Sequence, residues 1–169
     1  EQGDERVETL RQHDAGTGLR QRDRVWLALN ALRASGRWPT AIERLRPLWE
    51  RSIPGDMVLA LGDSFEEEGM RLLERLAAAR REVMQLQVLS CDERDFSFSG
   101  GHRFRDPETG EELLGDGDAM RRDYLQRFEQ AQRLRQTRLQ QAGIMHATTW
   151  MDEPADAGLR RLLAQGANR

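Results

Sequence analysis

The chain has 169 residues, of which 38% are hydrophobic and 33% are charged, so it is long enough to bury a core as one domain. Its formal net charge of −3 excludes a general attraction of the whole protein to nucleic acid. The longest apolar runs are far shorter than the ~20 residues that cross a bilayer, so we expect no membrane segment in this piece. Cys91 is the only cysteine, which excludes an internal disulfide and indicates a reducing, cytoplasmic location.

The N-terminal part of the chain predicts a loose leader followed by helices. Residues 1–21 have few apolar positions, so the folded domain is expected to span residues 22–169. Apolar residues recur at helical spacing from Arg22 to Ser35 and predict a helix there. Thr40 and Glu43 have the spacing of a capping box, in which each side chain satisfies a free amide of the first helical turn.

Three short apolar runs predict buried β-strands over Met57–Leu61, Val83–Leu89 and Met145–Met151. Helical periodicity predicts helices over Glu66–Arg81 and Asp118–Ala142, which separate these strands along the chain. Strands that alternate with helices and are apolar on both faces are typical of a parallel sheet covered on both sides. The expected fold class is therefore α/β, a three-layer sandwich around a mainly parallel sheet.

Two further segments complete the predicted order of elements. Phe96–Leu114 contains the turn sequence Pro107–Gly110 between two short runs, which predicts a β-hairpin inserted before the long helix. Asp152–Pro154 then open a last helix that ends near Gln165. The hairpin interrupts the alternation of strands and helices that precedes and follows it.

Four segments, in a fixed order, carry a resemblance to a known family. They are the run Val58–Glu67, the strand Arg81–Leu89, the hairpin segment Phe104–Glu111 and the closing segment Gly143–Pro154. Their sequences resemble those of a bacterial family known as domain of unknown function 58. The resemblance extends over roughly residues 25–165.

The resemblance implies a von Willebrand factor A-like fold, a Rossmann-like arrangement of which this chain holds the C-terminal portion. In that fold three loops at the strand ends supply the ligands of a metal-dependent adhesion site. Asp63 stands where the resemblance places the aspartate of the third loop, and Thr40 where it places the threonine of the second. The first strand and its Asp-x-Ser-x-Ser loop have no counterpart before Arg22, so we expect this motif to be missing. We therefore expect Mg²⁺ in a complete domain of this kind and no cofactor in this chain.

Helix capping offers a different interpretation of the same residues. Asp63 or Ser64 has the position of an N-cap for the helix that follows, and Glu43 explains Thr40 locally. On the functional interpretation, Asp63, Ser64 and Thr40 form a partner-binding surface at the carboxyl ends of the strands, where open α/β sheets collect their ligands. Trp38, in the loop before Thr40, is expected to join this surface.

The long predicted helix carries an excess of arginine, which raises the question of nucleic-acid binding. Its arginines are Arg121, Arg122, Arg127, Arg133, Arg135 and Arg138. The same helix has an apolar face that includes Tyr124 and Phe128, so the arginines are expected to form its solvated side. We therefore expect no nucleic-acid partner.

The expected function is a protein–protein interaction module rather than an enzyme. The resemblance implies a partner among AAA-type ATPases of the MoxR kind, bound through the loops at the strand ends. Two alternatives remain open: a metal-assisted hydrolase that uses Asp63 with a water molecule, and a truncated fragment with no independent activity, since the chain begins at Glu1. An incomplete sheet would also expose an edge strand, which favours self-association.

Overall fold

A computed structural model describes residues 16–31, 46–63, 67–105 and 110–166. The chain divides into two compact units, residues 1–40 and residues 41–169. In the first unit, helix α1 (Leu19–Asn30) begins inside the predicted loose leader, so that prediction is wrong for its last three residues. Gly18, with a φ of 83°, precedes the helix, and the residues from Leu19 onward have good helix propensity. In the described ranges no helix is both long and apolar enough to span a bilayer.

The second unit contains the three-stranded parallel sheet that the sequence predicts. Its first described element is a short helix, α2 (Arg46–Arg51). The strands are β1 (Met57–Gly62), β2 (Glu82–Leu89) and β5 (Met145–Trp150), and they lie in the order β1-β2-β5. Both pairs are parallel, so the carboxyl ends of all three strands meet at one edge of the sheet.

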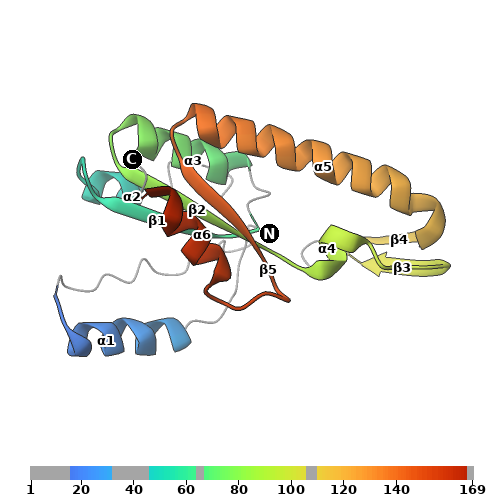
Figure 1. Ribbon diagram of the computed structural model, residues 1–169, viewed down its shortest axis with the longest axis horizontal. Coiled ribbons are helices and arrows are strands. Elements are labelled where there is room, and N and C mark those ends of the chain that lie inside the picture. The colour runs from blue at the N-terminus through green and yellow to red at the C-terminus, as the bar shows by residue number, and fades with distance from the viewer. Residues whose placement is uncertain (1–15, 32–45, 64–66, 106–109, 167–169) are drawn as a thin grey trace, which may run out of the picture. The chain divides into compact units, whose positions relative to one another are not determined.

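Helices pack on both faces of this sheet (Figure 1). The prediction of a buried strand is wrong for one face of β1, because Met57, Leu59 and Leu61 are exposed there. The helices α3 (Glu67–Ala78) and α5 (Gly117–Gln141) pack on one face, where Leu139 is 0% exposed in a core shared with β2. The helix α6 (Ala157–Gly166) packs on the other face, where Leu162 is also 0% exposed. Because side chains alternate along a strand, β2 contributes to both cores and is buried along most of its length. The fold is therefore mixed α/β in three layers.

The inserted hairpin is present as predicted. Its strands β3 (Gly101–Arg105) and β4 (Glu112–Asp116) pair antiparallel. A short helix, α4 (Cys91–Asp95), precedes the hairpin and was not predicted. Its first turn is held by a capping box, in which Ser90 and Glu93 exchange side-chain and backbone hydrogen bonds.

Aromatic side chains attach this hairpin to α5. Phe96, which ends α4 in the left-handed conformation with a φ of 44°, is 6% exposed. Its ring centroid lies 4.5 Å from that of Tyr124 on α5 and 5.1 Å from that of Phe98. Phe104 of β3 stacks on Phe96 at 5.9 Å. These contacts hold the hairpin against the start of the long helix.

Candidate functional site

The carboxyl ends of the three strands lie together at one end of the sheet, which we call the rim. The rim consists of Asp63 after β1, residues 90–95 after β2, and residues 150–153 at the end of β5. Asp63 is exposed and directly follows Gly62, the last residue of β1. Its backbone carbonyl accepts a hydrogen bond from the side chain of Gln87 on β2 at 2.8 Å. Asp63 therefore stands at the rim, as its position after a strand led us to expect.

Asp63 is the one member of the predicted partner-binding surface that the structure describes. Ser64, Thr40 and Trp38 lie outside the described residues, so their place beside Asp63 stays a prediction. The helix α3 begins at Glu67, four residues after Asp63, and the proposed cap at Ser64 falls in the part between them.

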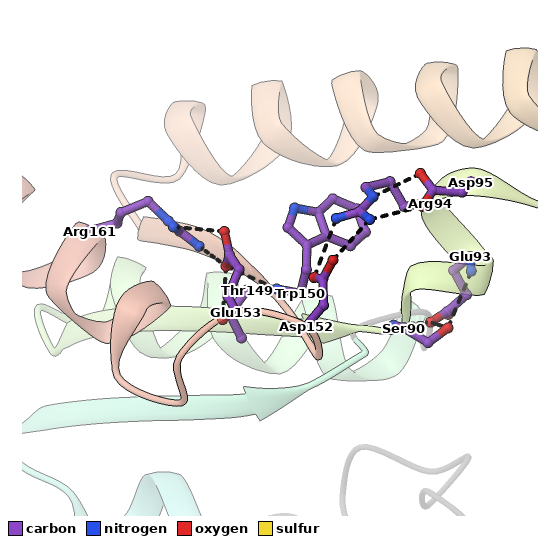
Figure 2. Close-up of polar contacts among 9 residues, drawn as sticks. All are labelled: Ser90, Glu93, Arg94, Asp95, Thr149, Trp150, Asp152, Glu153 and Arg161. Carbon is purple, nitrogen blue, oxygen red and sulfur yellow. Dashed lines mark hydrogen bonds and ion pairs between the residues drawn. The ribbon is translucent and has the colours of Figure 1, made fainter.

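Arg94 is the centre of an ion-pair cluster at the rim (Figure 2). Its Nε and Nη2 atoms donate to the two carboxylate oxygens of Asp95 at 2.8 Å each, and Nη2 also donates to Asp152 at 3.1 Å. Its guanidinium carbon lies 5.3 Å from the ring centroid of Trp150, a cation–π distance. The hydrogen bonds from Arg94 are the main cause of a lowered pKa at both Asp95 and Asp152. Both carboxylates are therefore ionised at neutral pH.

A second ion pair fixes the turn after β5. Arg161 of α6 donates to the two carboxylate oxygens of Glu153 at 2.5 and 3.1 Å, and the backbone N–H of Trp150 donates to the same carboxylate at 3.2 Å. Arg161 also donates to the carbonyl of Thr148 at 2.7 Å. The hydrogen bond from Arg161 is the main reason why the pKa of Glu153 is lowered. Side chains of the turn and of α6 thus hold the end of β5 in place.

Cys91, the single thiol of the chain, begins α4 and is partly buried. Burial raises the pKa of its thiol, and Asp152 raises that pKa further through a hydrogen bond and its negative charge. The thiol is therefore protonated at neutral pH, the form that is a poor nucleophile. The groups of this cluster are suited to presenting fixed charges rather than to transferring protons.

A buried polar network connects the rim to α5. The side chain of Gln87 is 0% exposed; its nitrogen donates to Asp63 and its oxygen accepts a hydrogen bond from Arg135 of α5. Arg135 also donates to Gln85, which is 2% exposed, at 3.0 Å. The central strand therefore carries polar side chains, rather than apolar ones, where it faces the second half of α5.

Two arginines of α5 correct the prediction that the arginines of this helix form a solvated face. Arg135 is half-buried against the sheet, and Arg138 donates to Glu74 of α3 at 2.5 Å and to Glu67 at 2.7 Å. Arg135 stands four residues before the buried Leu139 and three before Arg138, so it shares one side of α5 with both, the side that packs inward. The long arginine side chains reach polar partners there that the sequence pattern does not reveal.

One Asp-x-Ser-x-Ser sequence occurs in the chain, at Asp95–Ser99, and it corrects the expectation that the motif is missing. It begins at the last residue of α4 rather than after a strand of the sheet. Arg94 binds both carboxylate oxygens of its aspartate, so Asp95 is the partner of an arginine. Within the ranges that the structure covers, no group of three or more His, Cys, Asp or Glu side chains is arranged to hold a metal ion.

The sequence patterns missed the residues that make most of the contacts at the rim. The spacing of Ser90 and Glu93 is a recognisable signal for the start of α4, and it would have placed the helical turn that carries Arg94 directly after β2. The contact between Arg94 and Asp152 joins residues 58 positions apart, so no local spacing reveals it.

Comparisons of the chain with protein-family models, with curated proteins and with solved structures found no match.

Proposed function

We propose that this chain is a protein–protein interaction module that binds its partner through the rim. The observation that carries the proposal is the ion-pair cluster at the rim, in which Arg94 is held between Asp95 and Asp152, on the same edge of the sheet as the exposed Asp63. Charged side chains that are already held in one position lose little conformational entropy when a partner binds. Fixed charges also favour one complementary partner over others.

The resemblance to domain of unknown function 58 supports a more specific form of the proposal. On this form, the sheet is the C-terminal portion of a von Willebrand factor A-like domain, and the partner is an AAA-type ATPase of the MoxR kind. The parallel strand order and the inserted hairpin are compatible with it. Asp63, Ser64, Thr40 and Trp38 would then present the contact surface.

We also propose that the rim is not catalytic. A general acid or base works best when its pKa lies near the operating pH. The pKa values of Asp152 and Glu153 are lowered and that of Cys91 is raised, so each of these groups moves away from neutral pH. These directions support a binding surface over a site of proton transfer.

The test is the affinity of the purified chain for a purified MoxR-type ATPase, measured by biolayer interferometry. Asp63→Ala should weaken binding about tenfold or more, which corresponds to about 1.4 kcal/mol. The matched control is Glu82→Ala, because Glu82 is an exposed acid at the start of β2, the opposite end of the sheet. The control should bind as the original chain does. Absence of binding, or equal losses in the two variants, would contradict the proposal.

A separate measurement tests whether Asp63 acts through a metal ion in this chain. A bound ion at 100 times its dissociation constant stabilises the folded state by about 2.7 kcal/mol, which a thermal unfolding curve detects. We expect Mg²⁺ to leave the melting temperature unchanged. A rise in melting temperature that disappears in Asp63→Ala would assign a metal-dependent contact to the rim instead.

A further inference from the structure

A pocket of about 510 Å³ lies between α5, β5 and α6. Its volume is within the range of roughly 300–1,000 Å³ that is common for small-molecule sites. Gln132, Arg135 and Gln136 of α5 line it, together with Thr148 of β5 and Gln165 of α6. The pocket is thus formed by the outer strand β5 and by the two helices that pack on opposite faces of the sheet.

Arg135 brings a positive charge into this pocket without a carboxylate partner among the described residues. Its Nη1 atom donates to Gln85 at 3.0 Å, and its Nη2 atom donates to Gln132 at 3.0 Å, to Thr148 at 3.4 Å and to Gln87. All of these acceptors are neutral. Its Nε atom is buried and has no hydrogen-bond partner in the described structure. An arginine that is removed from water in this way is costly unless an anion approaches it.

The other titratable groups that line the pocket do not neutralise this charge. Glu129 is the single acid among the described lining residues, and Arg133 already binds it at 2.5 Å. Burial is the main cause of the lowered pKa of His146, so this imidazole is neutral at neutral pH. The same desolvation lowers the pKa of Arg135 to about 10, which still leaves it charged at neutral pH. The pocket therefore carries one uncompensated positive charge.

We propose that this pocket binds a small organic carboxylate, with Arg135 as its cationic partner. The planar guanidinium matches the geometry of a carboxylate, whose oxygen would replace Gln132 or Thr148 at the Nη2 atom. The aromatic rings of Phe128 and Trp150 also line the pocket and offer an apolar wall for the carbon part of the ligand. The pocket shares Trp150 with the rim, and Gln87 links Arg135 to Asp63. The inference nevertheless concerns a small ligand held by Arg135 and requires no partner protein, so it does not depend on the proposed function.

The first test compares two probes that have the same shape and different charge, phenylacetate and phenylacetamide. The indole N–H signal of Trp150 in a ¹H–¹⁵N spectrum should shift saturably with phenylacetate. Phenylacetamide should bind about tenfold more weakly or not at all, a difference of about 1.4 kcal/mol or more. Equal affinities for the two probes, or no saturable shift with phenylacetate up to its solubility limit, would overturn the proposal.

Variants then assign the binding to Arg135. Arg135→Met should abolish the phenylacetate shift, whereas Arg122→Met, the control at an exposed position of the same helix, should preserve it. Gln132→Glu decides the question even if Arg135→Met fails to fold, because it places a carboxylate where the Gln132 oxygen now lies 3.0 Å from the guanidinium. This variant should have a higher melting temperature and should no longer bind phenylacetate. Unchanged binding in Gln132→Glu would show that the anion does not use Arg135.

Discussion

The side-chain amide of Gln87 donates a hydrogen bond of 2.8 Å to the backbone carbonyl of Asp63, and so connects the buried centre of the sheet to its rim. The same side chain is 0% exposed and accepts a hydrogen bond from Arg135. Asp63 is therefore held in place both by β1, which it directly follows, and by Gln87 of the neighbouring strand β2. Through Gln87, the end of β1 is connected to the long helix α5.

Replacing Gln87 by methionine tests this connection. Methionine has a similar shape but offers no amide, so the Asp63 carbonyl and an Arg135 N–H lose these partners. We expect the free energy of unfolding, measured with urea, to fall by about 1–3 kcal/mol. In an Arg135→Met background the loss should be smaller, because the hydrogen bond between Arg135 and Gln87 is already absent. Equal losses in both backgrounds would show that Gln87 and Arg135 are not coupled.

The ion pair between Arg94 and Asp152 predicts a pH dependence of stability. The pKa of Asp152 is lowered in the folded state, so the folded protein binds fewer protons there than the unfolded chain, whose aspartates titrate near about 3.9. The stabilisation is therefore present above about pH 4 and is lost as the pH falls through the lower, folded-state pKa. Asp152→Asn should lower the melting temperature at pH 7, and its difference from the original chain should shrink in acid.

The control for this measurement is Asp156→Asn. Asp156 pairs with Arg160 four residues later, and both side chains are well exposed, so this pair contributes little. The melting temperature of Asp156→Asn should be the same as that of the original chain at every pH. If the difference in melting temperature between Asp152→Asn and the original chain stays the same in acid, the charge of Asp152 is not the cause of the stabilisation.

Close packing of α6 on the sheet gives a prediction at Gly158. A Cβ atom there would lie 2.5 Å from the Cβ of Thr149 and 2.7 Å from the Cδ1 of Leu86. Gly158→Ala should therefore destabilise the protein by about 1–3 kcal/mol in urea unfolding, although alanine is the better helix former. Gly166→Ala is the control, since its nearest neighbour would be the sulfur of Met145 at 3.5 Å. A gain of stability in Gly158→Ala would mean that α6 does not pack this closely.

The two outer edges of the sheet differ in a way that bears on self-association. On β5, Arg161 and Gln165 of α6 donate to the carbonyls of Thr148 and His146, at 2.7 and 3.1 Å, so side chains already occupy this edge. On β1, the alternate residues on the face away from α3 are exposed apolar side chains. They are Met57 at 64%, Leu59 at 43% and Leu61 at 65% exposed. An apolar edge strand of this kind is a template for pairing with a second chain.

We therefore expect the chain to self-associate with rising concentration in sedimentation velocity experiments. Leu59→Lys should reduce this association, because a charge on an edge strand opposes pairing. Leu134→Lys is the matched control, since Leu134 is 65% exposed on α5. A chain that stays monomeric at every concentration, or equal effects of the two variants, would show that β1 is not the contact.

The order and type of most helices and strands could be predicted from local sequence patterns. Apolar runs and helical spacing are local properties, so they predicted the three parallel strands, the hairpin and the helices between them. Local backbone conformation altered their ends. The helix α3 stops at Ala78 rather than Arg81, because Arg80 adopts a left-handed φ of 62°.

Local patterns could not predict which charged side chains form ion pairs and which are buried, because these contacts form between segments far apart in the chain. Arg94 finds Asp152 only because β2 and β5 end side by side, and Arg135 turns inward only because Gln85 and Gln87 face it from the central strand. An arginine looks the same in the sequence whether it faces water or a buried amide. Its partner is set by long-range packing, which carries no local periodicity, and both candidate sites of this protein depend on such partners.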